Sequence, residues 1–140
     1  MISGVSHEAV FHVAANMRAA DKEEIYPLHW DESPFVLTAA VMAAPRYAYL
    51  AWDGNRPIAV FGAAEIRPTV WQAYCFATDE FPKVYREVTK FLIRQVKPYL
   101  FNELGANRIF ADSHIAHKDA HRWLQRLGAQ VSGLALAPST

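Results

Sequence analysis

The middle of the chain constrains the fold most, because three strand patterns follow one another with only turn residues between them. Tyr47–Trp52, Pro57–Ala63 and Val70–Phe76 are rich in aromatic and aliphatic residues. Asp53-Gly54-Asn55 separates the first two, and glycine and asparagine tolerate the positive φ of a tight turn. Pro68 marks the second turn. The pattern predicts an antiparallel meander of three strands.

A long amphipathic stretch and a further strand pattern follow the meander. Phe81-Pro82 opens the stretch, its apolar residues recur at helical spacing, and Pro98 is expected to kink or end the helix. Asn107–Asp112 is typical of a strand. Strand–helix–strand units cross over a sheet in the right-handed sense. We therefore expect Val70–Phe76 and Asn107–Asp112 to be parallel neighbours.

The two ends of the chain supply the remaining elements. Val10–Val13 is predicted as a first strand, although the neighbouring alanines also allow a helix. Asp21, with a glutamate three residues later, and Ser33-Pro34 are predicted to begin helices. A final helix is expected over about His117–Leu127, and a last strand over Gln130–Leu136. The order of these predicted strands and helices indicates one α/β (α+β) domain over residues 1–140, with a mixed, mostly antiparallel sheet and helices on both faces.

Composition excludes several classes of protein. The chain has 140 residues, and Lys+Arg and Asp+Glu are 14 each, so its formal net charge is zero. This balance argues against a mainly electrostatic binder of nucleic acid or anionic membranes, and we interpret the basic residues after Pro82 as a solvated helix face. The single cysteine, Cys75, excludes an intramolecular disulfide. Neither a signal peptide nor an apolar run of about 18 residues is present, so we expect a soluble cytoplasmic protein without membrane contact.

The order of elements and two segments resemble the GNAT acetyltransferases. Met17–Glu24 is similar to the family's first strand, which ends in arginine and leads through an aspartate into the first helix. In the final helix, Ala120 and Leu127-Gly128-Ala129 match the family's frame. His117 stands where the family commonly has asparagine, and Leu124 where it often has the tyrosine proposed as general acid. The resemblance implies the GNAT fold.

The segment after the third meander strand departs from that family. GNAT enzymes carry Arg/Gln-x-x-Gly-x-Gly/Ala there, and its backbone amides wrap the pyrophosphate of acetyl-CoA. Thr78–Arg86 contains no glycine, Asp79 and Glu80 add negative charge, and Pro82 removes one donor. We therefore expect the fold without its usual cofactor, and enzymatic activity stays open.

A narrower resemblance is to the small internal virion protein of short-tailed bacteriophages, which looks like a GNAT domain without the glycine loop. Pro57–Gly62, the stretch from Trp71 through the basic helix, and Trp123–Ala129 are similar to it in order and spacing. This resemblance implies a virion-associated or assembly protein. Its partners would be other virion or assembly proteins, in the host cytoplasm and the virion.

The alternative is an active acetyl-CoA-dependent N-acyltransferase acting on a small amine or a protein amine. The backbone of Phe76, Ala77 and Thr78 would then hold the cofactor and the oxyanion. His117 or Glu65 would act as base. For Glu65 the sequence favours a solvent-facing turn residue over a base, because exposed glutamates are the norm.

Two further groups of residues are candidates for a site. Trp30 lies in the loop between the first two predicted helices, and Tyr26 at the end of the first of them. An aromatic residue in a polar loop packs back on the core or contacts a partner, and the first is the more common case. Tyr26 and Trp30 are nevertheless the candidates for an acceptor cleft or a protein interface. His114, His117 and His121 could suggest a metal site. A short histidine motif without structural context is weak, so we predict no metal.

Overall fold

The sheet is mixed and mostly antiparallel, as predicted. The protein was analysed as a computed structural model, which describes residues 1–19, 21–22, 33–111, 122–123, 125–126 and 135–136. Within these residues, hydrogen bonding joins six strands in the order β1-β2-β3-β4-β5-β6. β2 is antiparallel to β1 and β3, β6 is antiparallel to β5, and β4 and β5 are parallel. The strands are β1 (Ile2–Gly4), β2 (Ala48–Asp53), β3 (Arg56–Arg67), β4 (Val70–Ala77), β5 (Arg108–Ala111) and β6 (Ala135–Leu136).

The described helices follow the predicted order, with α1 in place of the expected first strand. They are α1 (His7–Ala15), α3 (Pro34–Met42) and α4 (Tyr85–Phe91), with 3-10 turns at Pro45–Tyr47 and Phe81–Lys83 and π-helical turns at Leu92–Val96 and Tyr99–Glu103. The Ser33 hydroxyl accepts a hydrogen bond from the Phe35 amide at 3.2 Å, which confirms the predicted helix start. Pro98 keeps helical dihedral angles between the two π-helical turns, so the helical backbone continues past it.

The predicted first strand is wrong. Val10–Val13 lies inside α1, whose buried residues Ala9, Val10, Val13 and Ala14 follow a helical period, and the four residues by themselves are too few to show that period. The first strand is instead Ile2–Gly4, which is too short to show a pattern of its own. The likeness of Met17–Glu24 to the end of a first strand is also wrong, because Met17 and Arg18 follow α1 and belong to no strand.

Both turns of the meander take positive φ angles, as tight turns between strands require. Gly54 has φ +62° between β2 and β3, where only a residue that tolerates this angle avoids strain. Thr69 has φ +67° directly after Pro68. β3 reaches Arg67, four residues beyond the predicted end at Ala63, and its register with β2 shifts between Ala51 and Trp52.

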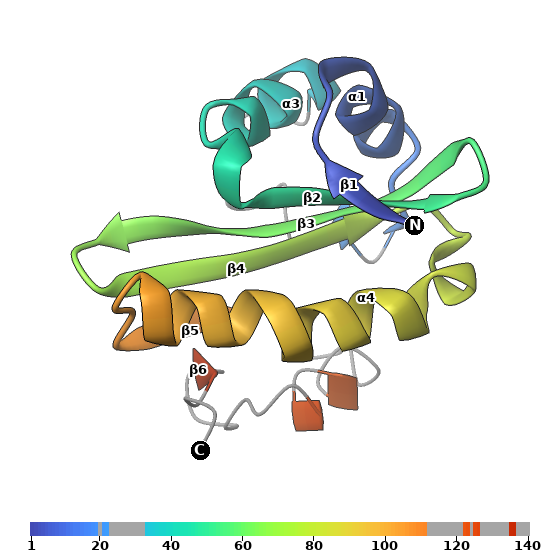
Figure 1. Cartoon of the computed structure of the whole chain (residues 1–140). Coiled ribbons are helices and arrows are strands. Elements are labelled where there is room, and N and C mark those ends of the chain that lie inside the picture. The colour runs from blue at the N-terminus through green and yellow to red at the C-terminus, as the bar shows by residue number, and fades with distance from the viewer. Residues whose placement is uncertain (20, 23–32, 112–121, 124, 127–134, 137–140) are drawn as a thin grey trace. The chain divides into compact units, whose positions relative to one another are not determined.

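The chain divides into two compact units, and β3 and β4 run through both. Unit 1 comprises residues 1–62 and 75–88. Within it, α1 and α3 lie on one face of β2 and β3, and the first turn of α4 lies on the other (Figure 1). Its fully buried large side chains include Val10, Leu50, Phe61, Phe76 and Val88. This core supports the end of β4, where the candidate site lies.

Unit 2 comprises residues 63–74 and 89–140. In it, the indole Nε1 of Trp123 donates a hydrogen bond to the Thr89 hydroxyl at 2.8 Å. Arg122, Trp123, Gln125 and Arg126 are helical, in agreement with the predicted final helix. This hydrogen bond fixes the described part of that helix to the residues that follow Val88.

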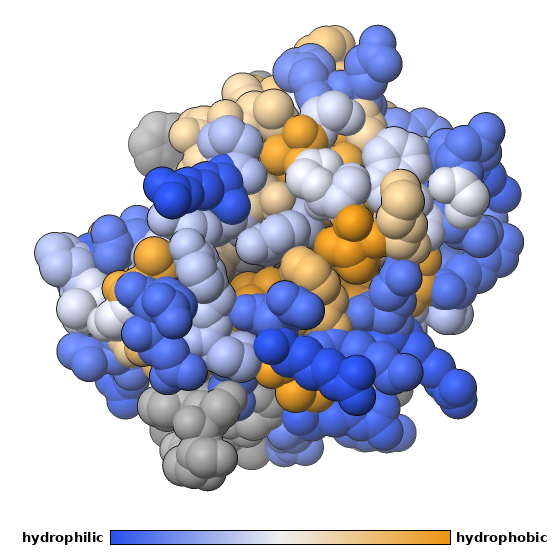
Figure 2. All heavy atoms as spheres, in the orientation of Figure 1, coloured by the Kyte–Doolittle hydropathy of each residue, from blue (hydrophilic) through white to orange (hydrophobic). Residues whose placement is uncertain are grey.

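The surface carries both hydrophilic and apolar side chains. Figure 2 shows apolar residues interspersed with hydrophilic ones on the face in view. The basic residues Lys83, Arg86, Lys90 and Arg94 are exposed, and Lys97 is partly buried, where desolvation lowers its pKa. No helix of the described residues has both the length and the apolar character that a membrane span requires. The large apolar side chains that stay exposed come from several elements and are Met1, Phe35, Val36, Ile66, Ile93 and Tyr99.

Candidate functional site

The end of β4 is anchored by a buried carboxylate. The Ala77 amide donates a hydrogen bond to Asp21 Oδ2 at 2.8 Å, and the Ala77 carbonyl accepts one from the Arg18 amide at 2.8 Å. Arg18 Nε and Nη2 each donate to one oxygen of the same carboxylate, at 2.9 and 2.8 Å. Asp21 is only 2% exposed, so its charge is acceptable only because these donors surround it. Residues 19, 21 and 22 are helical and the Lys22 amide donates to the Arg18 carbonyl, so Asp21 lies within a helix and the predicted helix start at Asp21 is wrong.

The same arginine contacts the turn that follows β4. Arg18 Cζ lies 4.7 Å from the centroid of the Phe81 ring, an arrangement favourable to a cation–π interaction. Phe81 is buried, and its ring meets Tyr85 edge-on with the centroids 6.0 Å apart. Arg18 thus connects the last residue of β4 with the first residue of the 3-10 turn.

The turn itself uses nearly all of its own amide donors. The Thr78 amide donates to the Ile58 carbonyl at 2.9 Å. The Glu80 amide donates to the Thr78 hydroxyl oxygen Oγ1 at 3.3 Å, and the Phe81 amide donates to the Thr78 carbonyl at 3.1 Å. The Lys83 and Val84 amides donate to the carbonyls three residues before them. Within Thr78–Val84, Asp79 alone has an amide that donates no hydrogen bond to the residues described. A phosphate wrapped by several free amides, as in a glycine-rich loop, does not fit this conformation.

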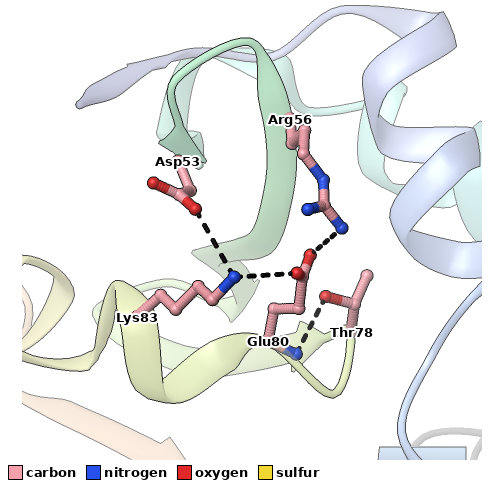
Figure 3. Close-up of polar contacts among 5 residues, drawn as sticks. All are labelled: Asp53, Arg56, Thr78, Glu80 and Lys83. Carbon is pink, nitrogen blue, oxygen red and sulfur yellow. Dashed lines mark hydrogen bonds and ion pairs between the residues drawn. The ribbon is translucent and has the colours of Figure 1, made fainter.

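Two cationic and two anionic side chains meet at the corner formed by this turn and the turn between β2 and β3 (Figure 3). The Glu80 carboxylate lies between Arg56 Nη2, which contacts Oε2, and Lys83 Nζ, which lies 3.1 Å from Oε1. Lys83 Nζ is also 3.8 Å from Asp53 Oδ2. Asp53 ends β2 and Arg56 begins β3, so the tight turn at Gly54 brings both residues to the corner. Glu80 and Lys83 are three residues apart in the turn after β4.

The pairing changes the acidity of Glu80. The hydrogen bond from Lys83 lowers the pKa of the Glu80 carboxyl below its ordinary value, and the charges of Arg56 and Lys83 add to this effect against an opposing contribution from desolvation. Because the folded-state pKa is lowered, the stability that this pairing contributes is present above the unfolded-state pKa of about 4.3. It is lost as the pH falls through the lower, folded-state value.

Replacing Lys83 with glutamine should raise the pKa of Glu80 toward its ordinary value, since its strongest hydrogen-bond donor is lost. The carboxyl carbon resonance of Glu80, followed by NMR during an acid titration, measures this change. Lys90→Gln removes the same charge from an exposed position further along α4 and should leave the titration of Glu80 nearly unchanged. An unaltered pKa in Lys83→Gln would contradict the pairing.

The structure describes only some of the residues predicted for the site. Phe76 and Ala77 are fully buried and Thr78 nearly so, at the predicted position where β4 ends. The amides of Ala77 and Thr78 already donate to Asp21 and to the Ile58 carbonyl, so a ligand could use them only by displacing these bonds.

The other predicted residues lie elsewhere. Glu65 is exposed in β3, before the turn rather than in it. Tyr26, Trp30 and His117 lie outside the described residues, as do His114 and His121. The described residues contain no cluster of three or more potential metal ligands.

Sequence reasoning missed the contributions of Arg56 and Asp21 to this corner. Arg56 pairs with a residue 24 positions away, and Asp21 accepts from an amide 56 positions away. No local pattern indicates either partner. The proximity of Arg56 to a predicted tight turn was the one available signal, since a turn brings the strand ends beside it together.

Solved structures identify the fold, although no family model and no characterised protein matches the sequence. An acetyltransferase of the GNAT family from Bacillus anthracis matches with a TM-score of 0.66 and 15% identity, over 92% of this chain and 78% of that one. The ribosomal-protein-S18-alanine N-acetyltransferase of Escherichia coli matches with a TM-score of 0.64 and 15% identity, over 100% and 94%. A GNAT superfamily phosphinothricin acetyltransferase from Sinorhizobium meliloti, solved in complex with AcCoA, matches with a TM-score of 0.63 and 13% identity, over 93% and 74%.

The protein therefore has the GNAT acetyltransferase fold, as the resemblance in its sequence implied. At this level of identity the likeness shows the fold alone. The finer resemblance to a phage virion protein finds no support in these matches.

Proposed function

We propose that the protein is an acyl-CoA-dependent N-acyltransferase. The observation that carries this proposal is the GNAT fold, which is shared with N-acetyltransferases over 92–100% of the chain. The acceptor would be an amine, as the name of the ribosomal-protein-S18-alanine N-acetyltransferase states for that protein.

The residues of the β4 corner fit the phosphates of such a substrate through side chains rather than through amides. Arg56 and Lys83 supply cations beside the turn, and guanidinium and ammonium groups bind phosphate well. Acyl-CoA would supply a thioester carbonyl for attack by the acceptor amine. The role of this corner would be to bind and orient the substrate.

A base must remove a proton from the amine during the transfer. His117 and Glu65 remain the candidates, because histidine and glutamate are common general bases. The new bond forms between the amine nitrogen and the acyl carbon, and the carbon–sulfur bond breaks. Leu124 replaces the tyrosine that the family often has as general acid, so we expect the leaving thiolate to take its proton from water.

Binding of acetyl-CoA tests the proposal directly. Calorimetric titration should show saturable binding with a Kd between about 1 µM and 1 mM, the usual range for enzyme substrates. Release of free CoA thiol in the presence of a panel of small amines and amino-terminal peptides should then reveal turnover. Absence of both binding and turnover would contradict the proposal.

The alternative function is a GNAT-fold protein that binds no acyl-CoA and acts through protein partners. The specific observation in its favour is that the amides from Ala77 to Val84 are used internally, with the exception of Asp79 and of Pro82, which has no amide proton. The predicted virion or assembly role belongs to this alternative. A folded protein without acetyl-CoA binding would favour it.

A further inference from the structure

The Glu80 carboxylate lies between two cations. Each of its oxygens serves a different partner, Arg56 on one side and Lys83 on the other (Figure 3). Phosphate and carboxylate present similar oxygen pairs to guanidinium and ammonium groups. The two cations therefore already bind one anion, the carboxylate of Glu80.

The charges of the cluster balance only while Glu80 is in place. Arg56 and Lys83 carry two positive charges, and Glu80 and Asp53 carry two negative ones. If the Glu80 side chain turns away, the remaining three residues have a net charge of +1. That change creates an attraction for a ligand that carries negative charge.

Displacement of Glu80 requires little rearrangement. The side chains of Arg56 and Lys83 are 60% and 52% exposed, so a ligand reaches them from solvent, and exposed ion pairs are weak. The backbone of the turn does not depend on the carboxylate, because the Phe81 and Lys83 amides donate to the carbonyls of Thr78 and Glu80. Glu80 can therefore change rotamer while the turn keeps its hydrogen bonds.

We propose that Arg56 and Lys83 form a binding site for a phosphate or diphosphate group, and that Glu80 occupies this site as an internal competitor until the ligand displaces it. The ligand group can come from free diphosphate or, if the proposed acyltransferase function holds, from acyl-CoA. Glu80 then sets the affinity of the site without belonging to the ligand's own contacts.

Removing the competitor should tighten anion binding. In phosphate-free buffer at low salt, Glu80→Gln should bind inorganic diphosphate about three- to tenfold more tightly than the wild type, the range expected when two exposed ion pairs no longer compete. Asp79→Asn is the matched control, since it removes the same charge one residue away from an exposed side chain that forms no ion pair with the described residues. Its effect should stay below about twofold. Equal gains in both variants, or no gain in Glu80→Gln, would overturn the proposal.

The cations should be necessary for this gain. Arg56→Gln and Lys83→Gln should each weaken diphosphate binding, and Arg56→Gln placed in the Glu80→Gln background should abolish the increase. Circular dichroism and thermal unfolding should confirm that each variant is folded, as expected for exposed side chains. A gain that persists without Arg56 would show that the site lies elsewhere and would contradict the proposal.

Parallel titrations with acetyl-CoA and with acetyl-pantetheine, which lacks the phosphates, separate this inference from the proposed function. Tighter diphosphate binding by Glu80→Gln without any acetyl-CoA binding would support the anion site and overturn the acyltransferase proposal. Equal acetyl-CoA binding by the wild type, Glu80→Gln and Arg56→Gln would support the acyltransferase proposal and overturn the anion site. Acetyl-CoA binding that tightens in Glu80→Gln, and clearly exceeds acetyl-pantetheine binding, would support both.

Discussion

Replacing Phe76 with alanine should lower the free energy of unfolding by about 3–5 kcal/mol, the range for a phenylalanine removed from a packed core. Phe76 is fully buried and stands one residue before Ala77, whose backbone is bound by Asp21 and Arg18. The substitution removes apolar contacts and leaves a cavity beneath the end of β4. The loss should therefore also loosen the turn that carries Glu80.

Urea unfolding, followed by tryptophan fluorescence, measures this effect. Phe35→Ala is the matched control, because the Phe35 side chain is 68% exposed and its main aromatic contact is the ring of Phe11, 4.7 Å away between centroids. It should cost no more than about 1.5 kcal/mol. Similar losses in the two variants would contradict the position of Phe76 in the core.

Replacing Asp21 with alanine should lower the free energy of unfolding by about 2–4 kcal/mol. The substitution leaves the buried Ala77 amide without its acceptor and deprives Arg18 of both hydrogen bonds to the carboxylate. Arg18 is partly exposed, so water can solvate it in part, which places the expected loss below that for a fully buried ion pair. The end of β4 should also exchange its amide protons faster.

Two variants make this result interpretable. Asp21→Asn keeps the shape and one acceptor but loses the charge, so its cost should be intermediate. Asp79→Ala removes an exposed carboxylate next to the same strand end and should change the stability by less than about 0.5 kcal/mol. If Asp21→Ala proves as mild as Asp79→Ala, the carboxylate does not anchor β4.

These two anchors bear on the candidate function. Phe76 and Asp21 hold the strand end, and the strand end positions the turn in which Glu80 and Lys83 lie. The exposed ion pairs at the corner contribute little to stability, so the corner can respond to a ligand while the strand below it stays fixed. Phe76 and Asp21 therefore contribute stability, whereas Glu80 and Lys83 would respond to a ligand. Variants of the two groups can be tested separately.

Sequence patterns by themselves determined the meander, the parallel crossover from β4 to β5 and the helix start at Ser33-Pro34. These features depend on local signals, such as turn residues, strand composition and a capping hydroxyl, together with the handedness of crossovers. The absence of glycine from Thr78–Arg86 is also visible in the sequence alone, and the structure explains its consequence for the amides.

Only the tertiary structure decided that the segment after Ser6 is α1 rather than a strand, because its short run of apolar residues fits both periods until burial distinguishes them. The tertiary structure also determined which groups contact the carboxylates of Asp21 and Glu80. Asp21 meets the amide of Ala77, and Glu80 meets Arg56, across 56 and 24 residues of chain. The neutral net charge of the sequence therefore gave no indication that Glu80 pairs with Arg56. Contacts between side chains that are far apart in the chain depend on how the strands assemble, and the residues next to each partner in the sequence do not determine them.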